Sequence, residues 1–158
     1  MLGPSKEIPL LNPDYRDMLS LFNEEKVEYL VVGAYALAYH GLPRATGDID
    51  IWIRRNAENA ERVWQALSRF GVPLFDLSQD DFTKPGIVLQ IGLAPRRIDI
   101  LTSIDGVSFE EAESEREQVE IEGISIPIIG RKHLLENKRA TGRLQDQADV
   151  ARLEGNQR

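Results

Sequence analysis

The sequence predicts an α/β (α+β) fold, in which a mixed β-sheet is flanked by helices and followed by a C-terminal pair of helices. Apolar residues recur at helical spacing in several segments. Between these segments lie short runs rich in β-branched residues, which are typical of strands. Helices and strands alternate in the first half of the chain, and mainly strands precede the final helices. That order of elements indicates a mixed sheet with helical layers.

The first half of the chain begins with a well-marked helix. Asn12 is a favoured N-cap and Pro13 suits the first helical position, so we expect a helix that runs to about Glu25. Further elements are expected at 27–32 (buried strand, ended by Gly33), 34–40 (short helix, stopped at 41–43), 48–53 (strand) and 56–70 (amphipathic helix).

The second half is expected to be richer in strands. The expected elements are a helical turn at 78–82, a hairpin of strands 87–91 and 96–101, a helix at 109–114, two short strands within 119–129, and helices at 131–141 and 144–153, divided at Gly142.

Length and composition predict one globular domain. The 158 residues are 42% hydrophobic and 28% charged, which suits one hydrophobic core. We expect a loose leader over 1–11 and a single domain over 12–158. No apolar run approaches the roughly 18 residues of a membrane span, and no signal pattern opens the chain, so a cytoplasmic protein without a membrane partner is expected. The absence of cysteine excludes disulfides, thiol nucleophiles and zinc–cysteine sites.

Three aspartates occupy alternating positions in two predicted strands. Asp48 and Asp50 project from one face, because residues i and i+2 of a strand point the same way. Asp99 stands between isoleucines in the second of these strands, and it joins the pair if the two strands are neighbours. Clustered carboxylates repel one another unless a cation separates them. Three such groups suit two Mg²⁺ ions and a triphosphate.

Other interpretations of these acids remain open at this stage. The aspartates could form the solvated face of two half-buried strands, although aspartate is a poor strand former. Asp99 could also lie on another face or edge, far from Asp48. Gly33, between a strand and a helix N-terminus, offers backbone N–H groups to a phosphate, but it also suits a plain tight turn.

The compound pattern of Val32-Gly33-Ala34 followed by residues 41–51, Gly-Leu-Pro-Arg-Ala-Thr-Gly-Asp-Ile-Asp-Ile, resembles the signature of the DNA polymerase β-type nucleotidyltransferase superfamily. The arrangement of Pro, Arg and Thr before the aspartates, together with residues 134–150, is similar to small bacterial nucleotidyltransferases. These include the AbiEii-like toxins of type IV toxin–antitoxin systems. The resemblance touches most of 27–153 and implies the nucleotidyltransferase fold.

The resemblance also implies a role for each matching residue. Asp48 and Asp50 would hold two Mg²⁺ ions, while Asp99 would hold the catalytic metal and help to deprotonate the attacking hydroxyl. Gly33 and the N–H of Ala34 would bind the β- and γ-phosphates. The superfamily usually has Ser or Gly at the second position, so Ala34 weakens this phosphate contact while keeping the backbone donor.

Four further residues are candidates for binding the nucleoside triphosphate. Arg44 could reach a phosphate, or instead fix its loop by an ion pair, and Thr46 would order the same turn. Lys138, which the resemblance links to Asp146, and Arg143 flank Gly142 and could direct positive charge at the triphosphate. Ordinary exposed helix charge is the alternative for both.

Together these features predict a Mg²⁺-dependent enzyme that transfers a nucleoside monophosphate from a nucleoside triphosphate to an acceptor hydroxyl. The resemblance allows the 3′ end of a transfer RNA, a protein side chain or a small molecule as acceptor, and a cognate toxin or antitoxin as partner. The net charge of −7 weighs against a large RNA footprint, although the basic segment 131–158 leaves one open. The alternative is a catalytically inactive binding module of the same fold, which Ala34 favours and the three acids disfavour.

Overall fold

The computed structural model describes residues 11–42, 47–93 and 95–155. Its elements, in chain order, are α1 (Pro13–Glu24), β1 (Tyr29–Val32), α2 (Gly33–Tyr39), β2 (Ile49–Ile53), α3 (Ala57–Phe70), the 3₁₀ helix η1 (Gln79–Thr83), β3 (Val88–Ile91), β4 (Ile98–Leu101), α4 (Phe109–Ser114), β5 (Glu117–Ile121), β6 (Ile124–Ile128), α5 (Arg131–Thr141) and α6 (Leu144–Gly155). Every element that the sequence predicts is present. Residues 1–10 of the expected leader lie outside the described part, whereas Leu11 is buried.

Local sequence explains where the helices begin and end. The Asn12 side chain accepts a hydrogen bond from the backbone N–H of Tyr15, and Asn56 caps α3 in the same way through Asn59. Gly71 ends α3 in the left-handed conformation that favours glycine. These caps set the helix boundaries close to those predicted from the sequence.

β1 is shorter than predicted, because it begins at Tyr29 and not at residue 27. The chain is still completing the turn after α1 at that point. Lys26 has a positive φ of 59°, and the N–H of Val27 donates to the carbonyl of Phe22. The apolar residue Val27 therefore extends the strand-like sequence pattern into the turn that precedes the regular strand.

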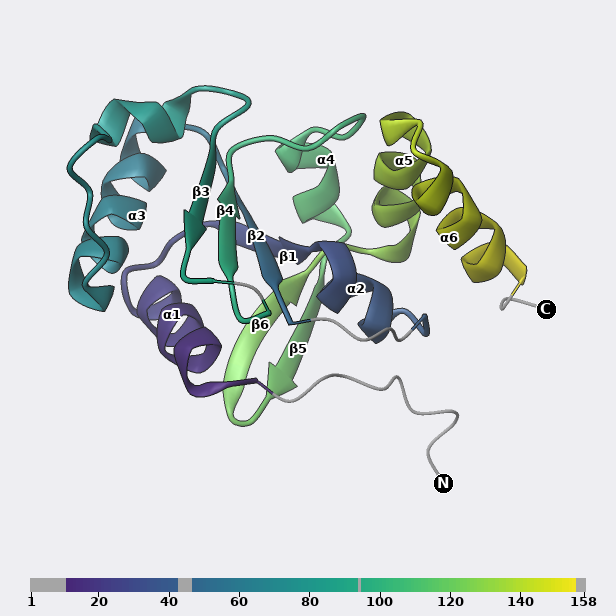
Figure 1. Cartoon of the computed structure of the whole chain (residues 1–158), viewed down its shortest axis with the longest axis horizontal. Coiled ribbons are helices and arrows are strands. Elements are labelled where there is room, and N and C mark those ends of the chain that lie inside the picture. Colours follow the sequence, from purple (N-terminus) through teal and green to yellow (C-terminus); the bar gives the residue numbers. More distant parts are fainter. Residues whose placement is uncertain (1–10, 43–46, 94, 156–158) are drawn as a thin grey trace.

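The six strands form one mixed sheet in the order β3-β4-β2-β1-β6-β5 (Figure 1). β2 and β4 are parallel neighbours, as are β1 and β6, and the other pairs are antiparallel. The predicted hairpin of β3 and β4 is confirmed. In Figure 1, α1 and α3 lie together on one side of the sheet, and the α5–α6 pair stands at the other end of the molecule. The predicted mixed sheet with flanking helices and a C-terminal helical pair is confirmed.

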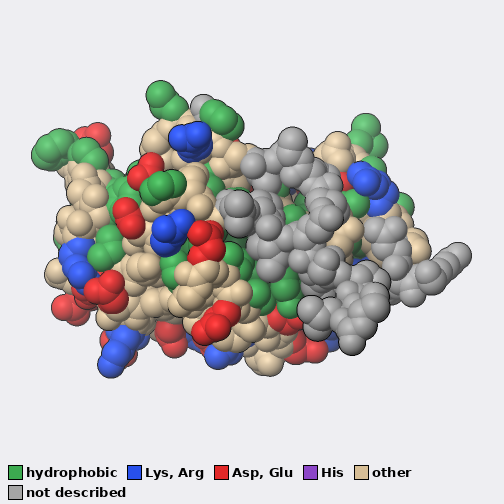
Figure 2. All heavy atoms as spheres, turned by 90° about the horizontal axis from the view of Figure 1, so that it is seen from below, with side chains coloured by type: hydrophobic (Ala, Val, Ile, Leu, Met, Phe, Trp, Pro, Cys, Tyr) green, Lys and Arg blue, Asp and Glu red, His purple; other side chains and the backbone are tan. Residues whose placement is uncertain are grey.

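The surface carries both signs of charge. On the described part of the face in Figure 2, acidic and basic side chains are interspersed and form no continuous basic surface. Part of the acidic segment 105–122 is neutralised by Arg54, whose guanidinium contacts Glu110 and Glu113 of α4 and Glu28. Within the described residues, no helix has both the length and the apolar character needed to cross a membrane.

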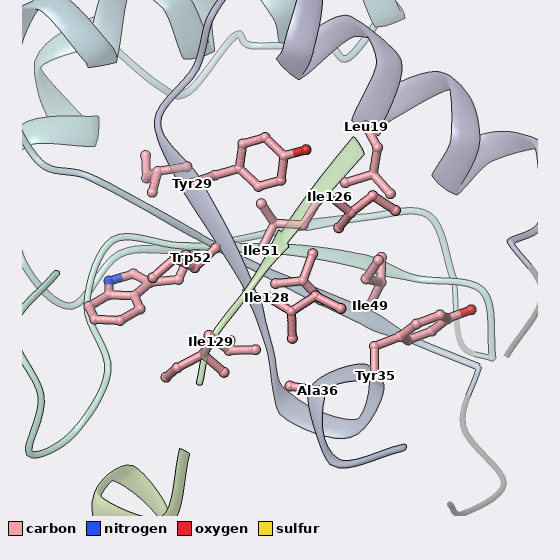
Figure 3. Packing of buried hydrophobic residues seen from close by; sticks show 14 of the residues in the cluster. Leu19, Tyr29, Tyr35, Ala36, Ile49, Ile51, Trp52, Ile126, Ile128 and Ile129 are labelled. Atoms are coloured by element: carbon pink, nitrogen blue, oxygen red, sulfur yellow. The ribbon is translucent and has the colours of Figure 1, made fainter. Parts of the chain in front are cut away.

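The hydrophobic core includes side chains from both faces of the central strands (Figure 3). Ile49, Ile51 and Ile53 are fully buried, and they alternate along β2 with Asp50 and Trp52. Trp52 packs edge-to-face on Phe109 of α4, with ring centroids 5.1 Å apart. The strand is therefore anchored on both faces, and the position of Asp50 between these anchors is fixed by packing.

Candidate active site

The three aspartates of the predicted cluster lie at one place in the sheet. β2 and β4 run parallel in a register that makes Asp50 and Asp99 direct partners. Neighbouring strands lie about 4.8 Å apart, so the two side chains leave the same face side by side. Asp48 stands two residues before Asp50, immediately ahead of β2. The alternative in which Asp99 lies far from the pair is wrong.

Gly33 brings the backbone of α2 against this acidic row. It has a φ of +67°, and its neighbour Val32 pairs with Asp50 across β1 and β2. A Cβ atom at Gly33 would lie 2.1 Å from Oδ2 of Asp50. Glycine is therefore required here both by its conformation and by the approach of the carboxylate. Ala34 follows in the first turn of α2, where the N-cap residue Val32 has no side-chain oxygen to occupy the free N–H groups.

The electrostatics of the row centre on Asp50. Burial raises the pKa of its carboxyl from 3.8 to about 6, and the charges of Asp99 and Asp48 act in the same direction on this pKa, while Arg97 lowers it. A bound cation would stabilise the ionised form of Asp50, because its positive charge would offset the repulsion among the three carboxylates.

Arg97 is a member of the site that the sequence analysis missed. Its Nε donates to Oδ1 of Asp99 at 2.7 Å, and its Nη2 lies 3.1 Å from Oδ2 of Asp99 and 3.4 Å from Oδ2 of Asp48. Strand spacing places Arg97 on the same face as Asp99, because the two stand at i and i+2, but it does not distinguish Arg97 from an exposed strand residue.

The donor chemistry of the site fits Mg²⁺. Three carboxylates share one face, and carboxylate oxygens are ligands that Mg²⁺ prefers. In the described part of the chain, no three acidic or histidine side chains are already gathered as a set of metal ligands. The carboxylates of Asp48 and Asp99 instead contact the guanidinium of Arg97. A metal ion at Asp48 and Asp99 would therefore compete with the guanidinium of Arg97 for these oxygens.

A pocket joins the acidic row to α5 and the start of α6. Its sheet wall holds the two acids Asp50 and Asp99 beside the apolar Val88 and Leu101. The remaining lining residues are Val32, Gly33, Ser103, Ile104, Asp105, Asn137, Lys138, Thr141, Arg143 and Asp146. The side chain of Asn137 donates to the carbonyl of Asp105 at 2.9 Å, which ties α5 to the loop after β4. The structure thus brings Lys138 and Arg143 to the same pocket as the acids.

Lys138 is buried in an ion-pair network between α5 and α6. Its Nζ lies 2.7 Å from Oδ1 of Asp146 and 3.2 Å from Oδ2 of Asp149. Oδ2 of Asp146 also accepts hydrogen bonds from Thr141 and Arg143, at 2.6 and 2.8 Å. Asp146 and Asp149 of α6 thus both pair with Lys138 of α5.

The two basic residues of the pocket differ in their availability to a ligand. The side chain of Lys138 is 10% exposed and has two carboxylate partners, whereas that of Arg143 is 74% exposed and contacts only Asp146 among the described acids. Arg143 is therefore better placed to meet a phosphate without breaking a buried ion pair. Its role in nucleotide binding stays a prediction, as does that of Lys138.

Two further candidate residues, Arg44 and Thr46, lie outside the described residues, so their predicted contacts stay predictions. His40 is described and buried, and its Nε2 lies 2.8 Å from the carbonyl oxygen of Ile129. That contact ties the end of α2 to the segment after β6.

Gly33→Ala is expected to destabilise the protein by about 3 kcal/mol. The left-handed backbone contributes about 1–2 kcal/mol for a residue with a Cβ atom, and displacement of the Asp50 carboxylate adds a similar amount. Chemical denaturation of the metal-free protein measures this loss.

Gly41→Ala is the matched control, because Gly41 has a φ of +99° but, among the described residues beyond its chain neighbours, no atom lies within 4 Å of the added Cβ. It carries the backbone strain alone and is expected to cost about 1 kcal/mol. Equal losses for the two variants would show that the approach of Asp50 to Gly33 is unimportant.

Comparison with known proteins gives similarity in structure only. No protein-family model matches the chain, and no curated protein matches its sequence. The chain is similar to the crystal structure of a Thermotoga maritima protein described as a candidate nucleotidyltransferase, with a TM-score of 0.59 and 20% identity over 94% of this chain and 97% of that one. It is also similar to the lincosamide antibiotic adenylyltransferase LnuA with lincomycin bound, with a TM-score of 0.56 and 17% identity over 92% of this chain and 97% of that one. These similarities establish that the chain has the nucleotidyltransferase fold.

Proposed function

We propose that this chain is a Mg²⁺-dependent nucleotidyltransferase, which transfers a nucleoside monophosphate from a nucleoside triphosphate to an acceptor hydroxyl. The observation that carries the proposal is the register of β2 and β4, which sets Asp50 beside Asp99 with Asp48 two residues upstream. Gly33, held against Asp50, supports it. The shared fold with two structures described as nucleotidyltransferases agrees with it.

The proposed reaction is an in-line displacement at the α-phosphorus. The acceptor oxygen bonds to this phosphorus as the bond to the bridging oxygen of the β-phosphate breaks, and pyrophosphate leaves with the electron pair. Asp99 receives the hydroxyl proton, and the N–H groups of Gly33 and Ala34 bind phosphate oxygens. Bound Mg²⁺, held by Asp48, Asp50 and Asp99, would neutralise charge on the triphosphate and the carboxylates.

The opposite wall of the pocket supplies the positive charge for the triphosphate. Arg143 contributes its exposed guanidinium. Lys138 is proposed as a second contact, which would exchange a carboxylate partner for a phosphate oxygen. Arg44 and Thr46 are proposed as further contacts on the chain that leads into β2.

The acceptor is proposed to be small or to present only a short end to the pocket. The net charge of −7 disfavours a long RNA footprint, and the charges on the described part of the face in Figure 2 are of mixed sign. Val88 and Leu101 give the pocket an apolar side next to the acids. A lincosamide such as the lincomycin bound to LnuA, the 3′ end of a transfer RNA and a protein side chain all fit this description. A role in a toxin–antitoxin system, with a cognate partner protein, rests on the sequence resemblance alone.

A second candidate function is a nucleotide-binding or protein-binding module without catalysis. Two observations favour it: Arg97 pairs with two of the three acids, and Ala34 replaces the usual Ser or Gly. The module would bind its ligand but would release no pyrophosphate.

The test is a transfer assay with each of the four α-labelled nucleoside triphosphates, Mg²⁺ and separate lincomycin, total transfer RNA and cell-protein arms. We expect one nucleotide to label one acceptor with release of pyrophosphate. Asp99→Asn is expected to lower the rate about a thousandfold, because several kcal/mol of charge stabilisation and the proton acceptor are lost together. Transfer by the variant at the parent rate would contradict the proposal, and nucleotide binding without transfer in any arm would favour the module.

A further inference from the structure

Arg97 has ionic contacts with two of the three acids. Its guanidinium uses both Nε and Nη2 on Asp99, and Nη2 also reaches Asp48. The side chain is 29% exposed, so it sits at the mouth of the acidic row and not deep in the core. Among the described residues, the guanidinium of Arg97 thus stands beside the carboxylates on this face of the sheet.

The backbone of Arg97 fixes this position from three directions. Its N–H donates to Oδ1 of Asp48 at 3.0 Å, and its carbonyl accepts from the N–H of Ile49 at 3.0 Å. The same carbonyl accepts from the hydroxyl of Tyr15 at 3.2 Å. These backbone hydrogen bonds therefore position the guanidinium beside the acids, immediately before β4 begins.

The carboxylates that Arg97 engages are two of those assigned to the metal. An oxygen that accepts an N–H from guanidinium has a lone pair committed to that bond, and the charge of the arginine repels an arriving divalent cation. A divalent cation in turn offers these oxygens twice the charge at shorter range. Arginine and metal are thus alternatives at Asp48 and Asp99.

We propose that Arg97 is a built-in counter-ion, which holds Asp48 and Asp99 in the metal-free protein and competes with the divalent cation for them. The inference rests on the proposed function, because it takes the three aspartates as the metal ligands. Arg97 is a positioning residue: it keeps like-charged side chains together before metal arrives, and it raises the Mg²⁺ concentration that the site requires.

Thermal unfolding of Arg97→Met, first in EDTA and then across a Mg²⁺ titration without nucleotide, tests the competition. Methionine keeps the apolar stem and removes the charge. We expect a lower melting temperature in EDTA, a larger rise with Mg²⁺ than the parent shows, and half-saturation at about tenfold lower Mg²⁺. A purely structural role would lower the melting temperature equally with and without Mg²⁺.

Two more variants make the result decisive. Arg96→Met removes the same charge from the exposed neighbouring residue, and it is expected to behave as the parent. Arg97→Lys keeps the charge but lacks the fork that engages both carboxylates, so its half-saturation should lie between those of the parent and Arg97→Met. If Arg97→Met folds only with Mg²⁺ present, that supports the competition, and Arg97→Lys then supplies the titration. A Mg²⁺ response no stronger than that of the parent in either Arg97 variant overturns the inference.

Failure of this inference and failure of the proposed function give different results. If the parent transfers nucleotide and the Arg97 variants respond to Mg²⁺ as the parent does, the proposed function is supported and the counter-ion role of Arg97 is contradicted. If the Arg97 variants bind Mg²⁺ more readily but the parent transfers no nucleotide, the counter-ion role of Arg97 is supported and the proposed function is contradicted.

Discussion

Asp50→Asn is expected to make the metal-free protein more stable at pH 8 while it removes nucleotidyl transfer. Asp50 is the acid whose ionisation the fold opposes most clearly, because burial raises its pKa from 3.8 to about 6 and the charges of Asp99 and Asp48 act in the same direction. Asparagine has nearly the same shape and carries no charge. The substitution therefore removes electrostatic repulsion without opening a cavity.

The pH dependence follows from the direction of this shift. The folded state binds the Asp50 proton more tightly than the unfolded chain does, so this group destabilises the fold progressively as the pH rises from about 4 through about 6. Above that range the penalty is constant and on the order of 2 to 3 kcal/mol. The Asp50→Asn variant has no such penalty, so the two proteins should have the same stability near pH 4 and differ most at pH 7 and above.

Urea unfolding of both proteins in EDTA, from pH 4 to pH 8, measures the effect. Asp76→Asn serves as the control, since Asp76 is exposed in the loop after α3 and the same change of charge there should leave stability nearly unchanged. A stability gain that is equal at pH 4 and pH 8 would mean that the Asp50 charge is not its cause.

The same substitution should abolish the stabilisation of the protein by Mg²⁺ with nucleotide and reduce transfer about a thousandfold, since a metal ligand contributes several kcal/mol to transition-state stabilisation. A variant that gains stability and loses activity is typical of a residue that serves catalysis and destabilises the folded protein. Transfer that survives Asp50→Asn would remove this residue from the proposed site.

The acidic row was predictable because it follows from strand geometry. The alternation of Asp and Ile in 48–51 and 98–100 places acids on one face and isoleucines in the core, whatever the strand order. The parallel pairing of β2 with β4 was not predictable in the same way. It depends on contacts between distant segments, which the alternation within each strand does not determine.

The contacts of Arg97 and Lys138 could not be predicted from the spacing of residues in strands and helices. Arg97 was within the predicted strand, but an arginine on an acidic face looks the same as an exposed strand residue until its neighbours are known. The pairing of Lys138 with Asp149 depends on how α5 and α6 cross at Gly142, which takes the left-handed conformation with a φ of 70°. Helical spacing alone does not determine that crossing.

The buried network of α5 and α6 carries the second large prediction, a loss of about 3–5 kcal/mol on Lys138→Met. The side chains of Lys138, Asp146 and Asp149 are 10%, 7% and 0% exposed, so water cannot replace the missing ammonium. Removing one partner of a buried ion pair leaves the other charge uncompensated. Here the carboxylates of Asp146 and Asp149 would face each other, the first still bonded by Arg143 and Thr141 and the second by the neutral amide of Gln145.

Acid titration should reveal the same network in the parent protein. Burial opposes ionisation of Asp146, but the hydrogen bonds from Lys138, Thr141 and Arg143 outweigh it and hold the pKa of this carboxyl below its ordinary value of 3.8. The unfolded chain therefore takes up the proton first, so the stability that Asp146 contributes is complete above about pH 4 and is lost as the pH falls further. Lys138→Met should weaken this acid-dependent loss, because the principal donor to Asp146 is gone.

Lys132→Met is the matched control for Lys138→Met. Lys132 lies on the same helix, its side chain is 67% exposed and its Nζ is 3.7 Å from Glu115, so its removal should cost less than about 1 kcal/mol. Adding Asp146→Asn to Lys138→Met should restore part of the lost stability, since it removes one of the two facing charges. Urea unfolding of the four proteins at pH 7 measures these differences. If the double variant is no more stable than Lys138→Met, repulsion between Asp146 and Asp149 is not the cause of the lost stability.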